Sequence, residues 1–425
     1  CDFKNIYNAN WLMFISVLIL AFLMSYKIIQ YLSRFKLLQL RSRIDIVMLS
    51  IFFIILYIPM SHISEAENST QENRMLAKYQ PLWQNGKLNY KFGESFEKWF
   101  NDRFLGRNLF ITIDTKLKLF ANRVYKTNTA IYIKKTNWMF YLPLLPSVPN
   151  TGHKKEIFNN IKKLNKFCQD NNIKFYMLIV PSKEMVYKEI LQKHYTFDEQ
   201  KKKDFIKFIA DIKNETSVDA VFPYQKLRKA AKKDFIFFKQ SHHWTDYGAF
   251  IGYEELMKVI KQDFPDIEVV SLNEYDKSTS KLIREDFNRG YYVGQIGKSL
   301  HITDDYIKTH LLKDDYTYYD HKNEVKPVIV VTDYKKTKYY KRNSPNSLKA
   351  FLTGTSMNED LQQFIPYSFS ELMYYRLNSV KNAPGRDEYK LLKRYKKEIL
   401  NFKPDILILT VTIGNIGGLS NLTKD

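Results

Sequence analysis

An alternation of helical segments with short, continuously apolar runs constrains the fold more than any other feature of this chain. Apolar residues at helical spacing over 156–171 lead into an apolar run at 173–180, and the order recurs with a helix at 199–214 and a run at 218–221. Strands that are apolar throughout are typical of sheets covered on both faces. The alternation therefore predicts an α/β fold, with a mostly parallel sheet flanked by helices.

The same patterns predict most of the remaining elements. Further helices are expected at 224–232, 249–262 and 359–378, and further strands at 235–238, 328–331, 348–353 and 405–412. Residues 335–347 are basic and polar, which is typical of a solvated loop. Upstream, helical spacing over 78–125 predicts a helical region, and two short apolar runs at 130–133 and 138–141 predict a hairpin.

Two adjacent histidines stand where the predicted strand 235–238 ends and a helix begins. The chain has only eight histidines, and His242 and His243 occur together here, directly before Trp244. Polar groups at the carboxyl end of a strand are where α/β proteins place their chemistry. A histidine in such a position can act as a general base near neutral pH.

A candidate nucleophile lies more than a hundred residues later. The predicted strand 348–353 ends in Gly354, Thr355 and Ser356. A serine at a strand-to-helix turn presents its hydroxyl at the open end of the sheet, where backbone N–H groups of the next helix can stabilise an oxyanion. Alone, Gly-Thr-Ser is a common turn sequence. Its position after a strand, together with the His-Trp pair, favours a functional role.

Together these segments resemble the acetyltransferase domains of the alginate O-acetylation proteins and their DHHW relatives, a branch of the SGNH hydrolase-like superfamily. The family pattern is Asp-x-His-Trp upstream and Gly-(Asp/Thr)-Ser downstream, and the residues at 243–244 and 354–356 match it. Other segments that resemble the family are 72–74, 100–104, 137–140, and 178–183 with Tyr187. In all, the resemblance covers roughly residues 66–425.

The resemblance implies that Ser356 is the nucleophile and that His243, the residue directly before Trp244, is the base. His242 then takes the variable position of the motif, and Trp244 packs the base in place. The position of the family's aspartate is Ser241. A serine hydroxyl can accept the Nδ1–H bond of the imidazole, but it adds no negative charge. The site is therefore a Ser–His dyad, recruits another carboxylate, or is catalytically degenerate.

The resemblance also implies donors for an oxyanion, because SGNH relatives use a glycine and an asparagine for this purpose. Asn415, just after the last predicted strand, is the candidate asparagine. Gly354 and Thr355 are candidates for oxyanion or substrate contacts beside the nucleophile, as are Trp244 and His242 beside the base. The sequence shows no metal-ligand spacing, and no cofactor is expected.

Two apolar runs near the start of the chain, at 11–26 and 46–60, predict a pair of N-terminal membrane helices. Each uncharged run is slightly short of a full span, so re-entrant or interfacial helices are an alternative, and a cleaved signal peptide is another for the first run. The loop between the runs is basic and acidic residues follow the second, which predicts a cytoplasmic loop. Everything after residue 62 is then periplasmic or extracellular.

These features predict three regions. Residues 1–62 hold the membrane helices and their short basic loop, 63–150 form a linker with the helical and hairpin elements, and 151–425 form the extracytoplasmic α/β domain. Because the first residue is Cys1 and not methionine, we expect the chain to be part of a longer protein. Cys168 is the only other cysteine, which excludes a disulfide framework and a cysteine-rich zinc site.

The formal net charge of +21 bears on the partners. It indicates either compositional drift or attraction to an acidic partner, such as an anionic glycan or a lipid headgroup. Nucleic acid is not expected as a partner, because the chain has no recognition helix, zinc finger or aromatic RNP-type motif.

The function that the resemblance implies is O-acetylation of a cell-surface or secreted polysaccharide at a bacterial cytoplasmic membrane. Acetyl would pass to Ser356 and then to a sugar hydroxyl, with an MBOAT-type membrane acyltransferase as the partner that supplies it. A carbohydrate acetylesterase, with water as the acceptor, is an alternative that the sequence does not separate. Ser241 favours another alternative, a glycan-binding or scaffold subunit without catalysis.

Overall fold

The computed structural model describes most of the chain beyond residue 62. The described residues are 63–69, 74–84, 86–110, 138–239, 241–280, 316–322, 327–332, 335–377 and 389–424, with shorter stretches between 23 and 52 and between 113 and 136. They belong to two compact units, residues 1–120 with 295–302, and residues 121–294 with 303–425. Each unit is described by itself.

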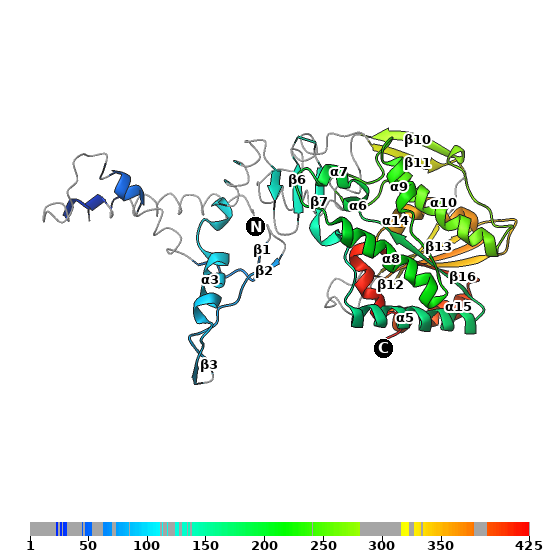
Figure 1. Cartoon of the computed structure of the whole chain (residues 1–425), viewed down its shortest axis with the longest axis horizontal. Helices are drawn as coiled ribbons and strands as arrows, with labels where there is room; N and C mark the ends of the chain where they lie inside the picture. Colours follow the sequence, from blue (N-terminus) through cyan, green and yellow to red (C-terminus); the bar gives the residue numbers. More distant parts are fainter. Residues whose placement is uncertain are drawn as a thin grey trace. The chain divides into compact units, whose positions relative to one another are not determined.

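In the first unit, two small hairpins precede one helix (Figure 1). The elements are β1 (Asn68–Ser69), β2 (Arg74–Met75), β3 (Trp83–Gln84), β4 (Lys87–Leu88) and α3 (Phe92–Arg103). The buried guanidinium of Arg103 donates to backbone carbonyls of Ser64 and Ala77, so this cation is structural here. The helical region predicted over 78–125 is interrupted at its start, because Gly86 turns the chain between β3 and β4 with a φ of +74°.

Most residues of the two apolar runs at 11–26 and 46–60 lie outside the described residues. In the part of the chain that is described, no helix has the length and apolar character needed to cross a membrane. The pair of membrane helices therefore stays a prediction.

A seven-stranded sheet forms the centre of the second unit, in the order β12-β13-β15-β14-β16-β8-β9. Its strands are β8 (Lys174–Val180), β9 (Asp219–Val221), β12 (Pro327–Thr332), β13 (Lys335–Lys341), β14 (Lys349–Gly354), β15 (Glu371–Arg376) and β16 (Ile406–Thr412). All pairings from β15 to β9 are parallel, and β12 and β13 extend the sheet as antiparallel strands. The predicted α/β fold with a mostly parallel sheet is confirmed.

Helices flank this sheet, as Figure 1 shows. They are α5 (Thr151–Asp170), α6 (Lys183–Val186), α7 (Lys188–Leu191), α8 (Glu199–Thr216), α9 (Tyr224–Ala230), α10 (Asp246–Asp263) and α15 (Leu391–Phe402). Beyond its first residue β8 is buried along its whole length, and it contacts both α5 and α10. Since neighbouring residues of a strand face opposite sides, β8 is covered on both faces.

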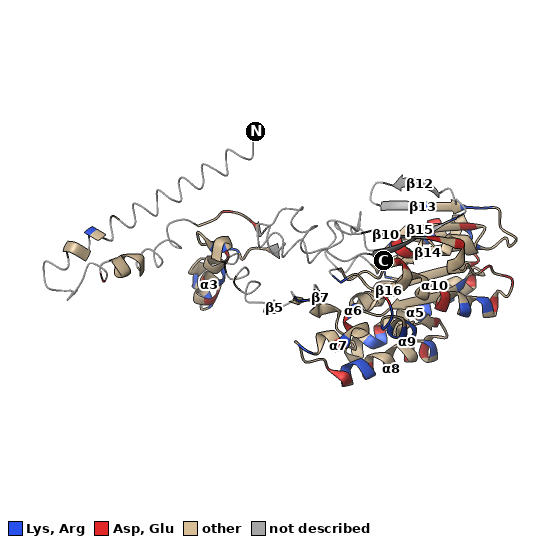
Figure 2. Cartoon of the chain, turned by 90° about the horizontal axis from the view of Figure 1, so that it is seen from above, with Lys and Arg blue, Asp and Glu red and all other residues tan. Residues whose placement is uncertain are grey.

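Smaller elements complete the second unit. A three-stranded sheet is formed by β5 (Val124–Lys126), β6 (Ala130–Ile133) and β7 (Trp138–Tyr141), and the last two are the predicted hairpin. A separate antiparallel pair consists of β10 (Tyr275–Ser280) and β11 (Tyr316–His321). Lys and Arg are interleaved with Asp and Glu along α8 and α10 (Figure 2), so these helices present surfaces of mixed charge.

Three sequence-based predictions of secondary structure were wrong. Residues 235–238 form no sheet strand with any described residue, and their one ladder contact within the described part of the chain is an isolated bridge from Phe237 to Trp244. The helix predicted over 359–378 is replaced by α14 (Asn358–Leu361), the 3-10 turn η5 (Ile365–Ser368) and strand β15, since Pro366 interrupts the helical pattern. The loop predicted over 335–347 begins as β13, which pairs with β12 and β15 despite its lysines.

Candidate active site

Ser356 lies at the carboxyl edge of the central sheet, in the turn between β14 and α14. Strand β14 is flanked by two parallel neighbours, β15 and β16, so its end lies well inside that edge. Gly354 closes the strand with a φ of +137°, and a Cβ at this position would lie 2.1 Å from the carbonyl oxygen of Thr410 on β16. The turn that presents Ser356 therefore requires a glycine at its start. Thr355 N then donates to the same Thr410 oxygen at 3.1 Å.

His243 lies in the irregular segment between α9 and α10. Phe237 and Trp244 form a single antiparallel bridge across this segment. The next residue, Thr245, is the N-cap of α10 and its hydroxyl accepts a hydrogen bond from Gly248 N at 3.3 Å. The bridge and the cap together fix the backbone on the helix side of His243.

The side chains of His243 and Ser356 are within hydrogen-bond distance of each other. His243 Nε2 lies 2.8 Å from Ser356 Oγ, and both residues are buried, with exposed fractions of 2% and 9%. On the other side of the ring, His243 Nδ1 lies 3.3 Å from Ser241 Oγ, and this oxygen also accepts from His243 N at 3.2 Å. When Ser241 accepts the Nδ1–H bond, Nε2 is left free to take the proton of Ser356.

The neighbours of the base, Trp244 and His242, have different environments. Trp244 is fully buried and its Nε1 donates to the carbonyl of Met357 at 3.1 Å, so it links the histidine segment to the serine turn. The ring of His242 packs against that of His243, with centroids 4.2 Å apart. Burial lowers the pKa of His242 to about 4, which keeps this imidazole neutral at physiological pH.

Asn415, the predicted oxyanion donor, makes its hydrogen bonds elsewhere. It lies in the 3-10 segment η7 (Ile413–Asn421), where its Oδ1 accepts from Thr412 Oγ1 at 2.8 Å and its Nδ2 donates to the hydroxyl of Tyr389. None of the contacts described for Asn415 is with Ser356 or His243. Its role in an oxyanion hole remains a prediction.

The chain is similar to known proteins in sequence and in fold. The sequence model of the family described as SGNH hydrolase-like domain, acetyltransferase AlgX, matches residues 131–311, which include the histidine motif and end before Ser356. Over these residues the chain is similar to an SGNH hydrolase-like domain.

The probable alginate O-acetylase AlgJ of Azotobacter vinelandii is 25% identical to the chain over 183 residues, which are 42% of this chain and 44% of that protein. The match thus spans less than half of the relative's length. Among solved structures, Bacillus cereus PatB1 with a sulfonyl adduct covers 72% of this chain and 100% of its own at a TM-score of 0.51. At 13% identity this likeness shows the fold alone. The resemblance to the alginate O-acetyltransferase-like SGNH family, predicted from the motifs, is confirmed.

One buried pair of charged residues was given no role by the sequence. Lys183 and Glu184 follow β8 and have exposed fractions of 1% and 0%, although lysine and glutamate are rarely buried. Glu184 accepts a hydrogen bond from Tyr141 N at 2.7 Å, and burial raises the pKa of its carboxyl group. The signal available in the sequence was two adjacent charged residues close behind a continuously apolar strand, with only Pro181 and Ser182 between.

Proposed function

We propose that this domain is an O-acetyltransferase that moves an acetyl group to hydroxyls of a cell-surface or secreted polysaccharide. The observation that carries the proposal is the 2.8 Å separation between Ser356 Oγ and His243 Nε2 at the carboxyl edge of the sheet. A serine hydroxyl is a weak nucleophile unless a base removes its proton, and this distance allows that transfer. The family resemblance supports acetyl as the group transferred.

In the first half-reaction, Ser356 Oγ attacks the acetyl carbonyl carbon while His243 Nε2 takes the hydroxyl proton. The tetrahedral intermediate carries a negative oxygen, for which backbone N–H groups that follow Thr355 in the turn after β14 are the proposed donors. Collapse of the intermediate breaks the bond to the leaving group, which receives the proton from His243. The product is an acetyl ester on Ser356.

In the second half-reaction, a sugar hydroxyl gives its proton to His243 Nε2 as its oxygen attacks the acetyl-serine carbonyl carbon. The bond to Ser356 Oγ then breaks, and the proton returns to that oxygen. Ser241 holds the imidazole in the required tautomer without charge, so the imidazolium that forms in each half-reaction lacks the aspartate of the family pattern.

The proposal includes a location and a partner. The apolar runs at 11–26 and 46–60 support anchoring in a bacterial cytoplasmic membrane, with the domain on the periplasmic or extracellular side. Acetyl must cross the membrane to reach it, and we propose an MBOAT-type acyltransferase as the supplier.

A specific observation favours one alternative. Because Ser241 is neutral, His243 is a weaker general base here than in a full Ser-His-Asp triad. A glycan-binding or scaffold subunit would not need an efficient base. A deacetylating esterase shares the chemistry of the first half-reaction and differs only in using water as the acceptor.

A fluorophosphonate or sulfonyl fluoride probe tests the proposal directly, because only an activated serine is labelled. We expect labelling of the wild type and none of Ser356→Ala. A folded wild type that is not labelled would leave the scaffold reading. Transfer from a surrogate acetyl donor to an oligosaccharide, measured against release of acetate, then separates the transferase from the esterase.

A further inference from the structure

The segment 234–245, which carries the candidate base, lies outside the sheet, so its backbone needs other hydrogen-bond partners. One side chain supplies three of them. Lys183 Nζ donates to the carbonyl oxygens of Phe238 at 3.1 Å, of Lys239 at 2.9 Å and of Ser241 at 2.7 Å. A lysine ammonium has three donors, so only the protonated form can make all three bonds.

Lys183 itself is buried beside two aromatic rings. It is 1% exposed, and its ammonium lies 5.9 Å from the ring centroid of Trp138 and 5.7 Å from that of Phe140, both on β7. Aromatic faces at such distances attract a cation. The rings, the three carbonyls and the adjacent Glu184 offset part of the cost of burying a charge, although burial still lowers the pKa of Lys183 to about 7.

Tyr187, one helical turn after Lys183, holds the other end of the same segment. Its hydroxyl accepts from Ile236 N at 2.9 Å and donates to Asp234 O at 3.4 Å. Its ring packs on Trp138 with the centroids 4.4 Å apart. Two side chains that follow β8 thus supply hydrogen bonds to the backbone of this segment, in addition to backbone bonds such as that from Met139 N to Lys239 O at 2.9 Å.

Ser241 joins this support to the candidate base. Its carbonyl accepts the shortest of the three bonds from Lys183, and its hydroxyl lies 3.3 Å from His243 Nδ1. A continuous series of contacts therefore runs from Lys183 through Ser241 and His243 to Ser356.

We propose that Lys183 is a positioning residue for His243, and that Tyr187 supports it at the far end of the segment. This inference rests on the proposed function, since it assumes that His243 activates Ser356. Lys183 touches neither substrate nor nucleophile in this scheme. It fixes the backbone of Ser241, and so the orientation of the imidazole. A misplacement of about 1 Å at a reacting centre lowers a rate by roughly 10²-fold.

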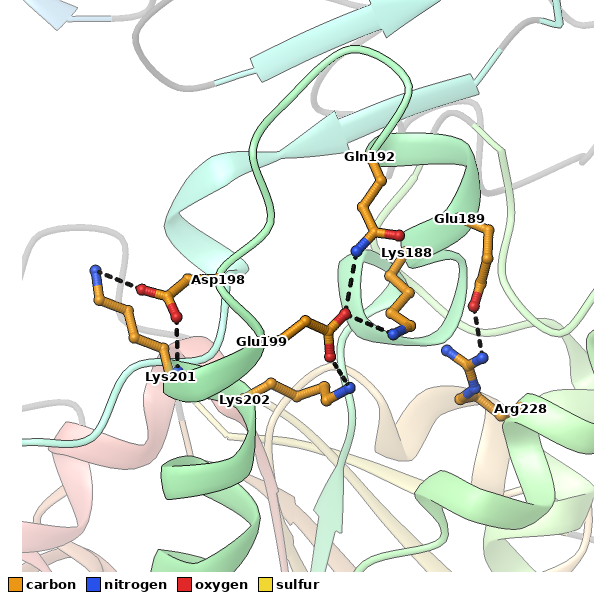
Figure 3. A network of polar contacts seen from close by, with 8 residues as sticks. All are labelled: Lys188, Glu189, Gln192, Asp198, Glu199, Lys201, Lys202 and Arg228. Atoms are coloured by element: carbon orange, nitrogen blue, oxygen red, sulfur yellow. Dashed lines mark hydrogen bonds and ion pairs between the residues drawn. The ribbon is translucent and has the colours of Figure 1, made fainter.

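The test is the rate constant for acylation of Ser356 by p-nitrophenyl acetate in the full chain. Lys183→Met keeps the length of the side chain and removes the donors, and we expect acylation to slow by roughly 10²-fold with KM little changed. The matched control is Lys188→Met, which removes the same charge from a lysine that pairs with Glu199 in a network apart from this segment (Figure 3). We expect the control to retain the wild-type rate.

A second background separates positioning from general stability. In His243→Ala no base remains to be positioned, so Lys183→Met should cause no further loss there. An equal loss in both backgrounds would overturn the inference. If Lys183→Met does not fold, Tyr187→Phe takes its place, because it keeps the ring and removes only the hydroxyl. It should slow acylation in the wild-type background and not in His243→Ala, and a wild-type rate would overturn the inference.

Different results would exclude the proposed function and the positioning role of Lys183. A folded wild type that acylates no faster than Ser356→Ala would remove the proposed function and this inference with it. A reactive wild type with an equally reactive, folded Lys183→Met would remove this inference alone.

Discussion

Ser241→Asp tests whether the missing carboxylate limits the reaction. Ser241 Oγ lies 3.3 Å from His243 Nδ1, so an aspartate here would face the imidazolium that forms during acylation. Opposite charges about 4 Å apart attract by about 4 kcal/mol at an effective dielectric constant of about 20. The substitution also replaces a neutral hydrogen bond worth about 1 kcal/mol. Residue 241 is buried, with an exposed fraction of only 3%.

Burial of the new carboxylate reduces the gain further, although the ammonium of Lys183 lies 2.7 Å from the carbonyl of the same residue and offsets part of that cost. A net stabilisation of about 2 kcal/mol corresponds to roughly 30-fold in rate. This is smaller than the change of about 10⁴ for removing the aspartate in the serine-protease example, because the serine here already holds the tautomer.

The assay is the pre-steady-state burst of p-nitrophenol, which reports acylation of Ser356. Ser241→Asn is the matched control, since it has nearly the shape of aspartate and no charge, and we expect no gain from it. Ser356→Ala should abolish the burst in every background. The reasoning is refuted if folded Ser241→Asp reacts no faster than Ser241→Asn. That result would mean that another carboxylate orients His243 or that a different step is limiting.

Two further predictions concern stability. Gly354→Ala should lower the melting temperature by an amount equivalent to about 1–3 kcal/mol or more, because it places a Cβ against the Thr410 carbonyl in a backbone conformation that side chains rarely adopt; an unchanged melting temperature would contradict this. For His242, burial lowers the pKa from 6.5 in the unfolded chain to about 4, so its contribution is complete above pH 6.5 and is lost as the pH falls to 4. We expect a loss of about 3 kcal/mol over that interval in urea titrations, and His242→Gln should remove most of it.

The sequence predicted the parts of the fold that depend on local pattern. Strands β8 and β16 are buried on both faces, and such burial leaves a continuous apolar run that can be recognised without knowing the neighbours. Strand β13 could not be recognised in this way, because its lysines and tyrosines form no continuous apolar run and its pairing with β12 and β15 decides the outcome. Strand β15 follows Pro366 within a segment whose spacing suits a helix, and its parallel pairing with β14 decides the outcome.

The candidate site, like the fold, could be predicted only in part from the sequence. Ser356 and His243 were predicted because each stands at the end of an apolar segment and within a short motif, and the structure places their reactive atoms 2.8 Å apart. The support from Lys183 could not be predicted, since its three acceptors are backbone carbonyls of an irregular segment. A backbone acceptor leaves no trace in the identity of the residue that bears it.

Lys183 has two opposing effects on the candidate base. Its three bonds order the segment that carries His243, which favours proton transfer, but a buried cation close to an imidazole disfavours the imidazolium. The second effect is visible at His242, where the charge of Lys183 adds to burial in lowering the pKa. In the family pattern an aspartate at 241 would oppose the charge of Lys183. Here residue 241 is a neutral serine, and the opposing group is Glu184, which accepts a hydrogen bond from Tyr141 N. We therefore interpret the main effect of Lys183 as ordering the segment that carries His243, at some electrostatic cost to the imidazolium.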